Sequence, residues 1–237
     1  MQTGARVRRF GRVTTLEHTS EIEHPWPRAF RFTLELMVEE AASPAAIDDA
    51  YRTVGGGADV ECVVNLFGAD AALVEALAAR GFVHAFDKVL MAKALGPAGI
   101  FDKERADLRT AKVDTMQLVE QSAVLGAENR SHAVMLGDRH LHDFLAFRND
   151  AIVASAQLVT TDLGVAYIGR MFTVPEHRRT GCCRALLDTA HAQARELGMT
   201  HAVLVPSLMA WEARVYQACG YETCRPMSLL VRARPPG

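Results

Sequence analysis

The chain has 237 residues, of which 49% are hydrophobic and 23% are charged. This composition is typical of a folded globular protein and excludes a wholly disordered chain. The 26 basic and 28 acidic side chains leave a formal charge of -2, so the chain as a whole does not attract nucleic acid or an anionic membrane surface. No apolar run approaches the ~18 residues of a membrane span, and the five cysteines, which form no C-x-x-C pair, predict neither a disulfide framework nor a zinc site. We therefore expect a cytoplasmic protein without nucleic-acid, membrane or metal partners.

Two stretches of the sequence share one order of elements. The first has a helix opened by Ser43-Pro44, a strand at 60–64, a helix at 70–80 and a strand that ends at Ala92. The second has a helix at 182–197, a strand at 201–205, a helix at 208–219 and a strand that ends at Val231. Setting Gly81 against Gly220 aligns the two stretches without a gap. Such internal similarity predicts a duplicated unit, although any two strand–helix–strand units resemble each other to some degree.

A domain boundary is predicted where two glycines and a proline interrupt the pattern, at 95–99. It divides the chain into an N-terminal half at 1–97 and a C-terminal half at 104–237. The elements expected between the boundary and the second stretch are a strand at 108–113, a helix capped by Asp114 that runs to Leu125, a hairpin around Asn149-Asp150 and a strand at 165–174. Strands and helices in this alternation predict an α/β fold with a mixed sheet.

The segment at 171–187 is the most informative for chemistry, because a strand leads through a short basic loop into a long helix. The free N–H groups at a helix N-terminus carry partial positive charge and bind phosphate. Gly181 permits close approach of a ligand to the backbone there. Arg178, Arg179 and Arg184 add full positive charges. The segment therefore predicts a pyrophosphate site, with an exposed arginine-rich turn as the alternative.

This segment resembles the acyl-CoA pyrophosphate loop of the GNAT superfamily of N-acyltransferases, whose pattern is Arg/Gln-x-x-Gly-x-Gly/Ala. Arg178 and Gly181 match the pattern, while Cys183 stands where the family has Gly or Ala. A second match follows in Tyr216-Gln-Ala-Cys-Gly-Tyr221, which is similar to the Tyr-x-x-x-Gly-Phe end of the family's fourth helix. The resemblance covers about residues 106–233 and implies the GNAT fold for the C-terminal half.

The resemblance also implies a reaction. An N-acetyltransferase would bind acetyl-CoA as its co-substrate and would need no metal. A primary amine would attack the thioester directly. This amine would belong to a small molecule, or less readily to a protein. Tyr216 would protonate the leaving thiolate, since the pKa of tyrosine, about 10, lies above that of a thiol, about 8.5. The residues implied to bind the co-substrate are Met171, Phe172, Thr173, Val174, Arg178, Arg179, Thr180, Gly181, Cys182, Cys183 and Arg184. The enzyme would be a monomer or a homodimer, with residues 227–231 as one route to pairing.

Several assignments stay open at this stage. The strand at 165–170 has no carboxylate to act as general base, and Glu176 is expected to face solvent, so a water chain to Asp162 or Tyr167 is the preferred hypothesis. The neighbouring histidines His132, His140 and His142 fit surface positions better than a metal site, because no compact ligand spacing accompanies them. Adjacent Cys182 and Cys183 fit small helix residues better than a redox pair.

The N-terminal half is predicted to be a degenerate, partial copy of the same fold. Glu39 and Glu40 occupy the position of the loop, where phosphate needs donors and positive charge. Leu77 aligns with Tyr216. Two alternatives to an N-acetyltransferase remain: a non-catalytic acyl-CoA sensor, and a protein that transfers aminoacyl groups from charged RNA, although the latter needs a basic groove that the sequence does not show.

Overall fold

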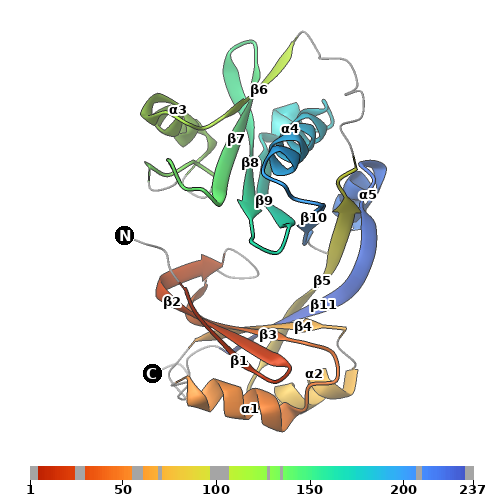
Figure 1. Ribbon diagram of the computed structural model, residues 1–237. Helices are drawn as coiled ribbons and strands as arrows, with labels where there is room; N and C mark the ends of the chain where they lie inside the picture. Colours follow the sequence, from red (N-terminus) through yellow and green to blue (C-terminus); the bar gives the residue numbers. More distant parts are fainter. Residues whose placement is uncertain are drawn as a thin grey trace. The chain divides into compact units, whose positions relative to one another are not determined.

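The computed structural model of the chain describes residues 5–24, 30–54, 61–68, 71–96, 107–126, 129–133, 136–206 and 210–232. Contacts of the backbone divide the chain into two compact units. Unit 1 holds Met1–Leu90, Pro206–Arg214 and Thr223–Gly237, and unit 2 holds Met91–Val205 and Val215–Glu222. The elements, which can be followed in Figure 1, are β1 (Ala5–Phe10), β2 (Val13–His24), β3 (Phe30–Val38), α1 (Pro44–Thr53), β4 (Cys62–Phe67), α2 (Ala71–Ala78), β5 (Val83–Ala94), β6 (Leu108–Lys112), α3 (Met116–Gln121), η1 (Ser122–Leu125), β7 (Leu141–Arg148), β8 (Ala151–Thr160), β9 (Val165–Thr173), η3 (Pro175–His177), α4 (Cys182–Glu196), β10 (His201–Leu204), α5 (Ala210–Ala218) and β11 (Glu222–Arg232).

Unit 2 is a sheet in the order β6-β7-β8-β9-β10-β5, with a helix packed on it. All neighbours are antiparallel except β9 and β10, which are parallel. Helix α4 covers β7, β8 and β9 and buries Leu186, Leu187 and Ala190. An apolar cluster formed by β7 and neighbouring segments lies around Leu145 and Phe147. The predicted α/β fold with a mixed sheet is therefore confirmed.

Local sequence explains how these elements begin and end. Asn149 and Asp150 both have positive φ, 47° and 64°, as a two-residue hairpin turn requires, and they join β7 to β8 as predicted. Gly198 follows α4 with a φ of 79°. The predicted cap at Asp114 is wrong by one residue. The side chain of Thr115 accepts the hydrogen bond from the Leu118 N–H instead.

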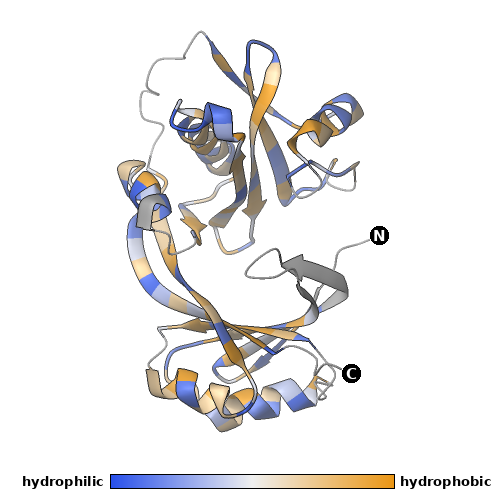
Figure 2. Cartoon of the chain, turned by 180° about the vertical axis from the view of Figure 1, so that it is seen from behind, coloured by the Kyte–Doolittle hydropathy of each residue, from blue (hydrophilic) through white to orange (hydrophobic). Residues whose placement is uncertain are grey.

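Unit 1 is built around the strands β1-β2-β3-β4-β11, in that order, with β5 on the far side of β11. Helix α1 carries both polar and apolar residues (Figure 2) and buries Ile47, Ala50 and Tyr51 in the core of this unit. The Ser43 side chain accepts the Ala46 N–H at the start of α1, as the Ser43-Pro44 pattern predicts.

The two halves of the sequence repeat one set of elements. The series β3-α1-β4-α2-β5 corresponds to β9-α4-β10-α5-β11. The starts of β4 and β10, of α2 and α5, and of β5 and β11 are each separated by 139 residues, the offset obtained by setting Gly81 against Gly220. The parallel pairing of β3 with β4 matches that of β9 with β10. This correspondence is what a duplicated unit predicts.

Each half contributes its last strand to the other unit. Strand β11, from the C-terminal half, pairs with β4 in unit 1, and the end of β5, Met91–Ala94, pairs with β10 in unit 2. The predicted domain limits 1–97 and 104–237 meet within residues 97–106, which lie outside the described residues, so these limits stay a prediction. The two compact units each contain segments from both halves of the chain. The predicted pairing of two chains through residues 227–231 is wrong, because β11 lies between β4 and β5 of its own chain.

Candidate active site

In unit 2 the strand β9 extends beyond its parallel neighbour β10, which ends at Leu204. They pair only from Val165 to Tyr167 of β9, which then continues for six residues, Ile168–Thr173, past its last pair with β10. Along the other edge of β9, Arg170 and Met171 together face a single residue of β8, which makes a β-bulge. Arg170 has a φ of 48° at this bulge. The end of β9 therefore presents backbone hydrogen-bonding groups on the side where its pairing with β10 has ended.

The pattern of hydrogen bonds shows which backbone groups face that side. The Val174 N–H donates to the Val153 carbonyl oxygen at 2.9 Å and so faces β8. Hydrogen-bonding groups alternate in direction along a strand, so those of Thr173 face away from β8. Arg178 Nε reaches the Thr173 carbonyl oxygen there, at 3.2 Å. Of the four strand residues predicted to bind the co-substrate, Thr173 directs its backbone groups away from β8, Met171 lies in the bulge, and Phe172 and Val174 contribute side chains to the apolar cluster.

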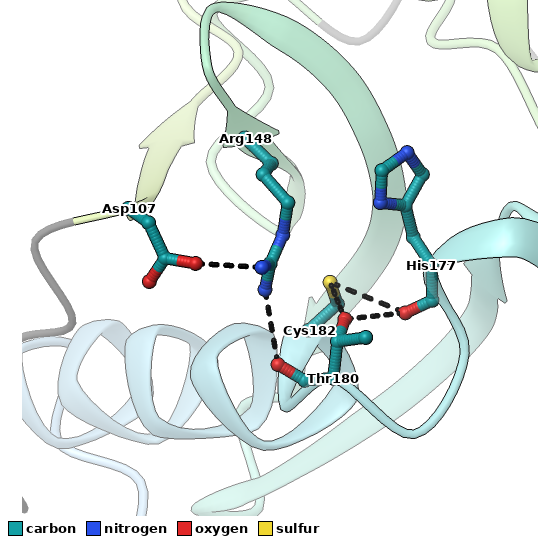
Figure 3. A network of polar contacts seen from close by, with 5 residues as sticks. All are labelled: Asp107, Arg148, His177, Thr180 and Cys182. Carbon is teal, nitrogen blue, oxygen red and sulfur yellow. Dashed lines mark hydrogen bonds and ion pairs between the residues drawn. The ribbon is translucent and has the colours of Figure 1, made fainter.

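The loop that follows β9 is held by its own side chains. Thr180 Oγ1 donates to the His177 carbonyl oxygen at 2.6 Å, and Cys182 Sγ lies 3.4 Å from the same Oγ1 (Figure 3). Arg179 and Gly181 both adopt the left-handed backbone conformation, with φ of 60° and 91°. Positive φ is accessible to glycine at little cost, which explains Gly181 at the N-cap of α4.

Helix α4 directs free backbone donors into this loop. Its first internal bond joins the Ala185 N–H to the Gly181 carbonyl oxygen, so the N–H groups of residues 182–184 point out of the helix end. Arg178, Arg179 and Arg184 are exposed around it, whereas Cys182 is buried. The predicted loop residues are thus brought together as a set of backbone donors with basic side chains beside it, and Cys182 has its side chain buried in the protein.

Unit 1 has a different arrangement at the corresponding place. Strands β3 and β4 stay paired up to Val38, the last residue of β3. The connection from β3 to α1 has five residues, 39–43, where that from β9 to α4 has eight, 174–181. Glu39 and Glu40 on this connection form ion pairs with arginines. Strand β3 therefore has no unpaired C-terminal end like that of β9, and the acidic side chains oppose phosphate.

Tyr216, the predicted general acid, lies on α5 in unit 2, whereas its counterpart Leu77 is fully buried in unit 1. Its ring packs edge to face on Tyr221, with ring centroids 6.1 Å apart. The Tyr221 hydroxyl is 2.7 Å from His191 Nε2, and both residues are only 2% exposed. Sequence analysis did not single out His191, because a histidine in a long helix gives no sign of its partner 30 residues away.

Comparisons with known proteins identify this part of the chain. Residues 109–221 match the family model described as the acetyltransferase (GNAT) family. Residues 109–221 are therefore a GNAT acetyltransferase domain. A search of curated proteins gave no match.

Solved structures share the fold of almost the whole chain. A GCN5-related N-acetyltransferase from Kribbella flavida is 20% identical with a TM-score of 0.73, covering 99% of this chain and 91% of that one. A putative acetyltransferase of the GNAT family from Novosphingobium aromaticivorans is 18% identical with a TM-score of 0.57, covering 85% and 84%. A tandem GNAT protein from the clavulanic acid biosynthesis pathway is 11% identical with a TM-score of 0.59, covering 95% and 84%.

Opposite α4, the sheet of the GNAT domain carries polar groups that sequence analysis missed. Asp143 on β7 is 7% exposed and accepts a hydrogen bond from Gln157 Nε2 on β8 at 3.0 Å. Gln157 lies opposite Gly169 on β9, and the Tyr167 ring covers that glycine so closely that a Cβ there would lie 2.6 Å from the ring. A buried carboxylate and a phenol thus share the face that leads to the bulge in β9.

The histidines and cysteines take ordinary structural positions. Burial, followed by the charge of Arg170, lowers the pKa of His132, and burial also lowers that of His142. His140 Nδ1 lies 3.3 Å from Thr160 Oγ1. Burial raises the pKa of Cys183 to about 12, which disfavours a reactive thiolate. Within the described part of the chain, no group of three or more potential metal ligands converges, and no helix is long and apolar enough to span a bilayer.

Acid is expected to destabilise the GNAT domain through His191. Burial, followed by the charges of Lys93 and Arg195, lowers its pKa to about 4, against about 6.5 in an unfolded chain. The unfolded state therefore binds more protons between these values, so the free energy of unfolding falls as the pH drops from 6.5 towards 4. Between pH 7 and pH 5 this loss is about 2 kcal/mol, measurable by urea denaturation. His191→Gln should remove that part of the pH dependence; an unchanged slope would contradict the assignment.

Proposed function

We propose that the protein is an N-acetyltransferase that transfers the acetyl group of acetyl-CoA to a primary amine of a small molecule. The observation that carries the proposal is the extension of β9 beyond its last pair with β10, directly before the basic loop at the N-terminus of α4. A strand end that is not paired with β10 suits an extended pantetheine arm, and the helix end suits a pyrophosphate. We further propose a monomer or homodimer in the cytoplasm, where the five free cysteines would stay reduced.

In the proposed reaction the amine nitrogen attacks the thioester carbon directly. An N–H group at the end of β9, at Met171 or Thr173, stabilises the negative charge that develops on the carbonyl oxygen. The C–N bond forms and the C–S bond breaks, and Tyr216 gives its phenolic proton to the departing sulfur. The proton that the amine loses passes through water towards Tyr167, which is 39% exposed on the same face as Asp143. Asp162, in the turn before β9, lies at the opposite end of that strand from Met171 and Thr173.

The charge on the acceptor side agrees with an amine. The Asp143 carboxylate is buried beside a neutral amide, and a positively charged group of the acceptor would compensate its charge. Near the loop of α4, by contrast, Arg178, Arg179 and Arg184 are exposed and suit the phosphates. The two ends of the proposed site thus carry opposite charge, in keeping with an anionic acyl donor and a basic acceptor.

Calorimetric titration of the whole chain with acetyl-CoA is expected to give one bound molecule per chain. Unit 1 has a cavity of about 580 Å³ lined by Glu39, Glu40, Phe67, Leu90 and two arginines, but its glutamates already pair with arginines and repel phosphate. The whole chain is required because the two units share strands. Thiol release from acetyl-CoA in a panel of primary amines then tests turnover. A stoichiometry of two would refute the degenerate N-terminal copy, and absence of binding would refute the proposed function.

A further inference from the structure

Arg148 links the hairpin of β7 and β8 to the loop that precedes α4. Its guanidinium donates from Nη2 to the Thr180 carbonyl oxygen at 3.1 Å and from Nη1 to Asp107 Oδ2 at 2.6 Å (Figure 3). The Arg148 side chain is 18% exposed, against 52% for Asp107. The arginine therefore lies behind the loop, with its charge balanced by a carboxylate from the start of the C-terminal half.

The contact fixes the direction of one peptide group. In a trans peptide the C=O and the following N–H point in opposite directions. Because the Thr180 carbonyl points at Arg148, the Gly181 N–H points away from it. That N–H belongs to the residue that caps α4, next to the free donors of the helix end. It joins those donors only while the peptide keeps this orientation.

Nothing in the local sequence enforces that orientation. Gly181 lacks a Cβ and adopts positive or negative φ with similar ease, so the peptide before it can rotate. In the rotated form the Thr180 carbonyl oxygen would face the pyrophosphate and repel it. The Thr180 side chain is anchored to the His177 carbonyl oxygen, but this bond leaves the following peptide free to turn.

We propose that Arg148 is a positioning residue of the pyrophosphate loop: it holds the Thr180–Gly181 peptide with its N–H directed at the phosphates of acetyl-CoA, and Asp107 orients its guanidinium. This inference rests on the proposed function. The planar guanidinium makes both bonds at once because its donors form a rigid fork. A lysine ammonium carries the same charge without that geometry.

Three variants test the proposal, with acetyl-CoA as the probe. Arg148→Met keeps the aliphatic stem and should raise the Kd and KM for acetyl-CoA by tenfold or more, while kcat at saturation stays within twofold. Arg148→Lys should be nearly as impaired, because charge alone does not hold the peptide. Arg109→Met is the matched control: it removes a neighbouring arginine that stacks on Phe147, and it should bind acetyl-CoA like the wild type.

Each result decides the matter. Wild-type affinity for acetyl-CoA in Arg148→Met would overturn the positioning role. Wild-type affinity in Arg148→Lys would also overturn it, because the positive charge alone would then be sufficient. If kcat of Arg148→Met falls as much as its KM rises, the positioning role is also overturned, because such a result indicates general damage to the fold. If the wild type itself does not bind acetyl-CoA, the proposed function is refuted, and this inference, which rests on it, is refuted as well.

Discussion

The double variant Arg178→Glu, Gly181→Glu is expected to lose affinity for acetyl-CoA by about 100-fold or more. Gly181 has a φ of 91°, where a residue with a Cβ costs roughly 1–2 kcal/mol. A glutamate there also opposes the partial positive charge of the helix end. At position 178 the substitution turns attraction into repulsion and removes the bond from Arg178 Nε to the Thr173 carbonyl oxygen. Both changes act where the pyrophosphate is proposed to bind, so their effects reinforce each other.

Calorimetry against acetyl-CoA measures this loss, and the matched control is Arg139→Glu, Gly137→Glu. Gly137 has a φ of 78° with open space around it, and Arg139 is exposed, so the control makes the same change in charge at comparable backbone strain, away from α4. The control should bind like the wild type. Binding by the double variant at wild-type affinity would show that the loop is not the site.

Features that depend on a few neighbouring residues could be predicted from the sequence. The loop before α4 is of this kind, because Gly181 and the arginines around it act through the end of their own helix. The hairpin turn at Asn149-Asp150 is another, since two residues with positive φ determine it. The 139-residue offset between β4 and β10 could also be predicted, because each half repeats the same local pattern.

Features that depend on which segments meet in space could not be predicted. The apolar pattern of β11 fits any sheet edge, and nothing in it specifies β4 as the neighbour. For the same reason Arg148 could not be linked to Thr180, 32 residues away, nor Asp143 to Gln157. Buried polar groups need partners, but the sequence does not tell which partner each one finds.

The exchange of strands gives the N-terminal half a specific part in the site. Strand β5 places Lys93 beside the end of α5, where its Nζ donates to the Cys219 carbonyl oxygen at 2.6 Å. A positive charge at a helix C-terminus stabilises it. Helix α5 is the one that carries Tyr216. The N-terminal half, whose own connection at 39–43 is acidic, thus supplies a strand and a cation that hold the helix of the proposed general acid.

Tyr216→Phe is expected to lower kcat by about 100-fold or more, with the Kd for acetyl-CoA unchanged. Phenylalanine keeps the edge-to-face packing on Tyr221 and loses only the hydroxyl. Without that proton the sulfur must leave as a free thiolate, which raises the barrier of the step that breaks the C–S bond. The thiol-release assay at saturating acetyl-CoA and amine measures kcat, and calorimetry measures the Kd.

Tyr221→Phe is the matched control, because it removes a hydroxyl from the ring next to Tyr216. That hydroxyl bonds to His191 in the protein interior, so its loss leaves a buried nitrogen without its partner and should lower the free energy of unfolding by about 1–3 kcal/mol. The kcat of Tyr221→Phe should stay within a few-fold of the wild type. Equal kcat in Tyr216→Phe and wild type would remove Tyr216 from the mechanism. If the wild type binds acetyl-CoA but turns over no amine, and Tyr216→Phe binds equally well, the protein is an acyl-CoA sensor, since a binding protein has no leaving group to protonate.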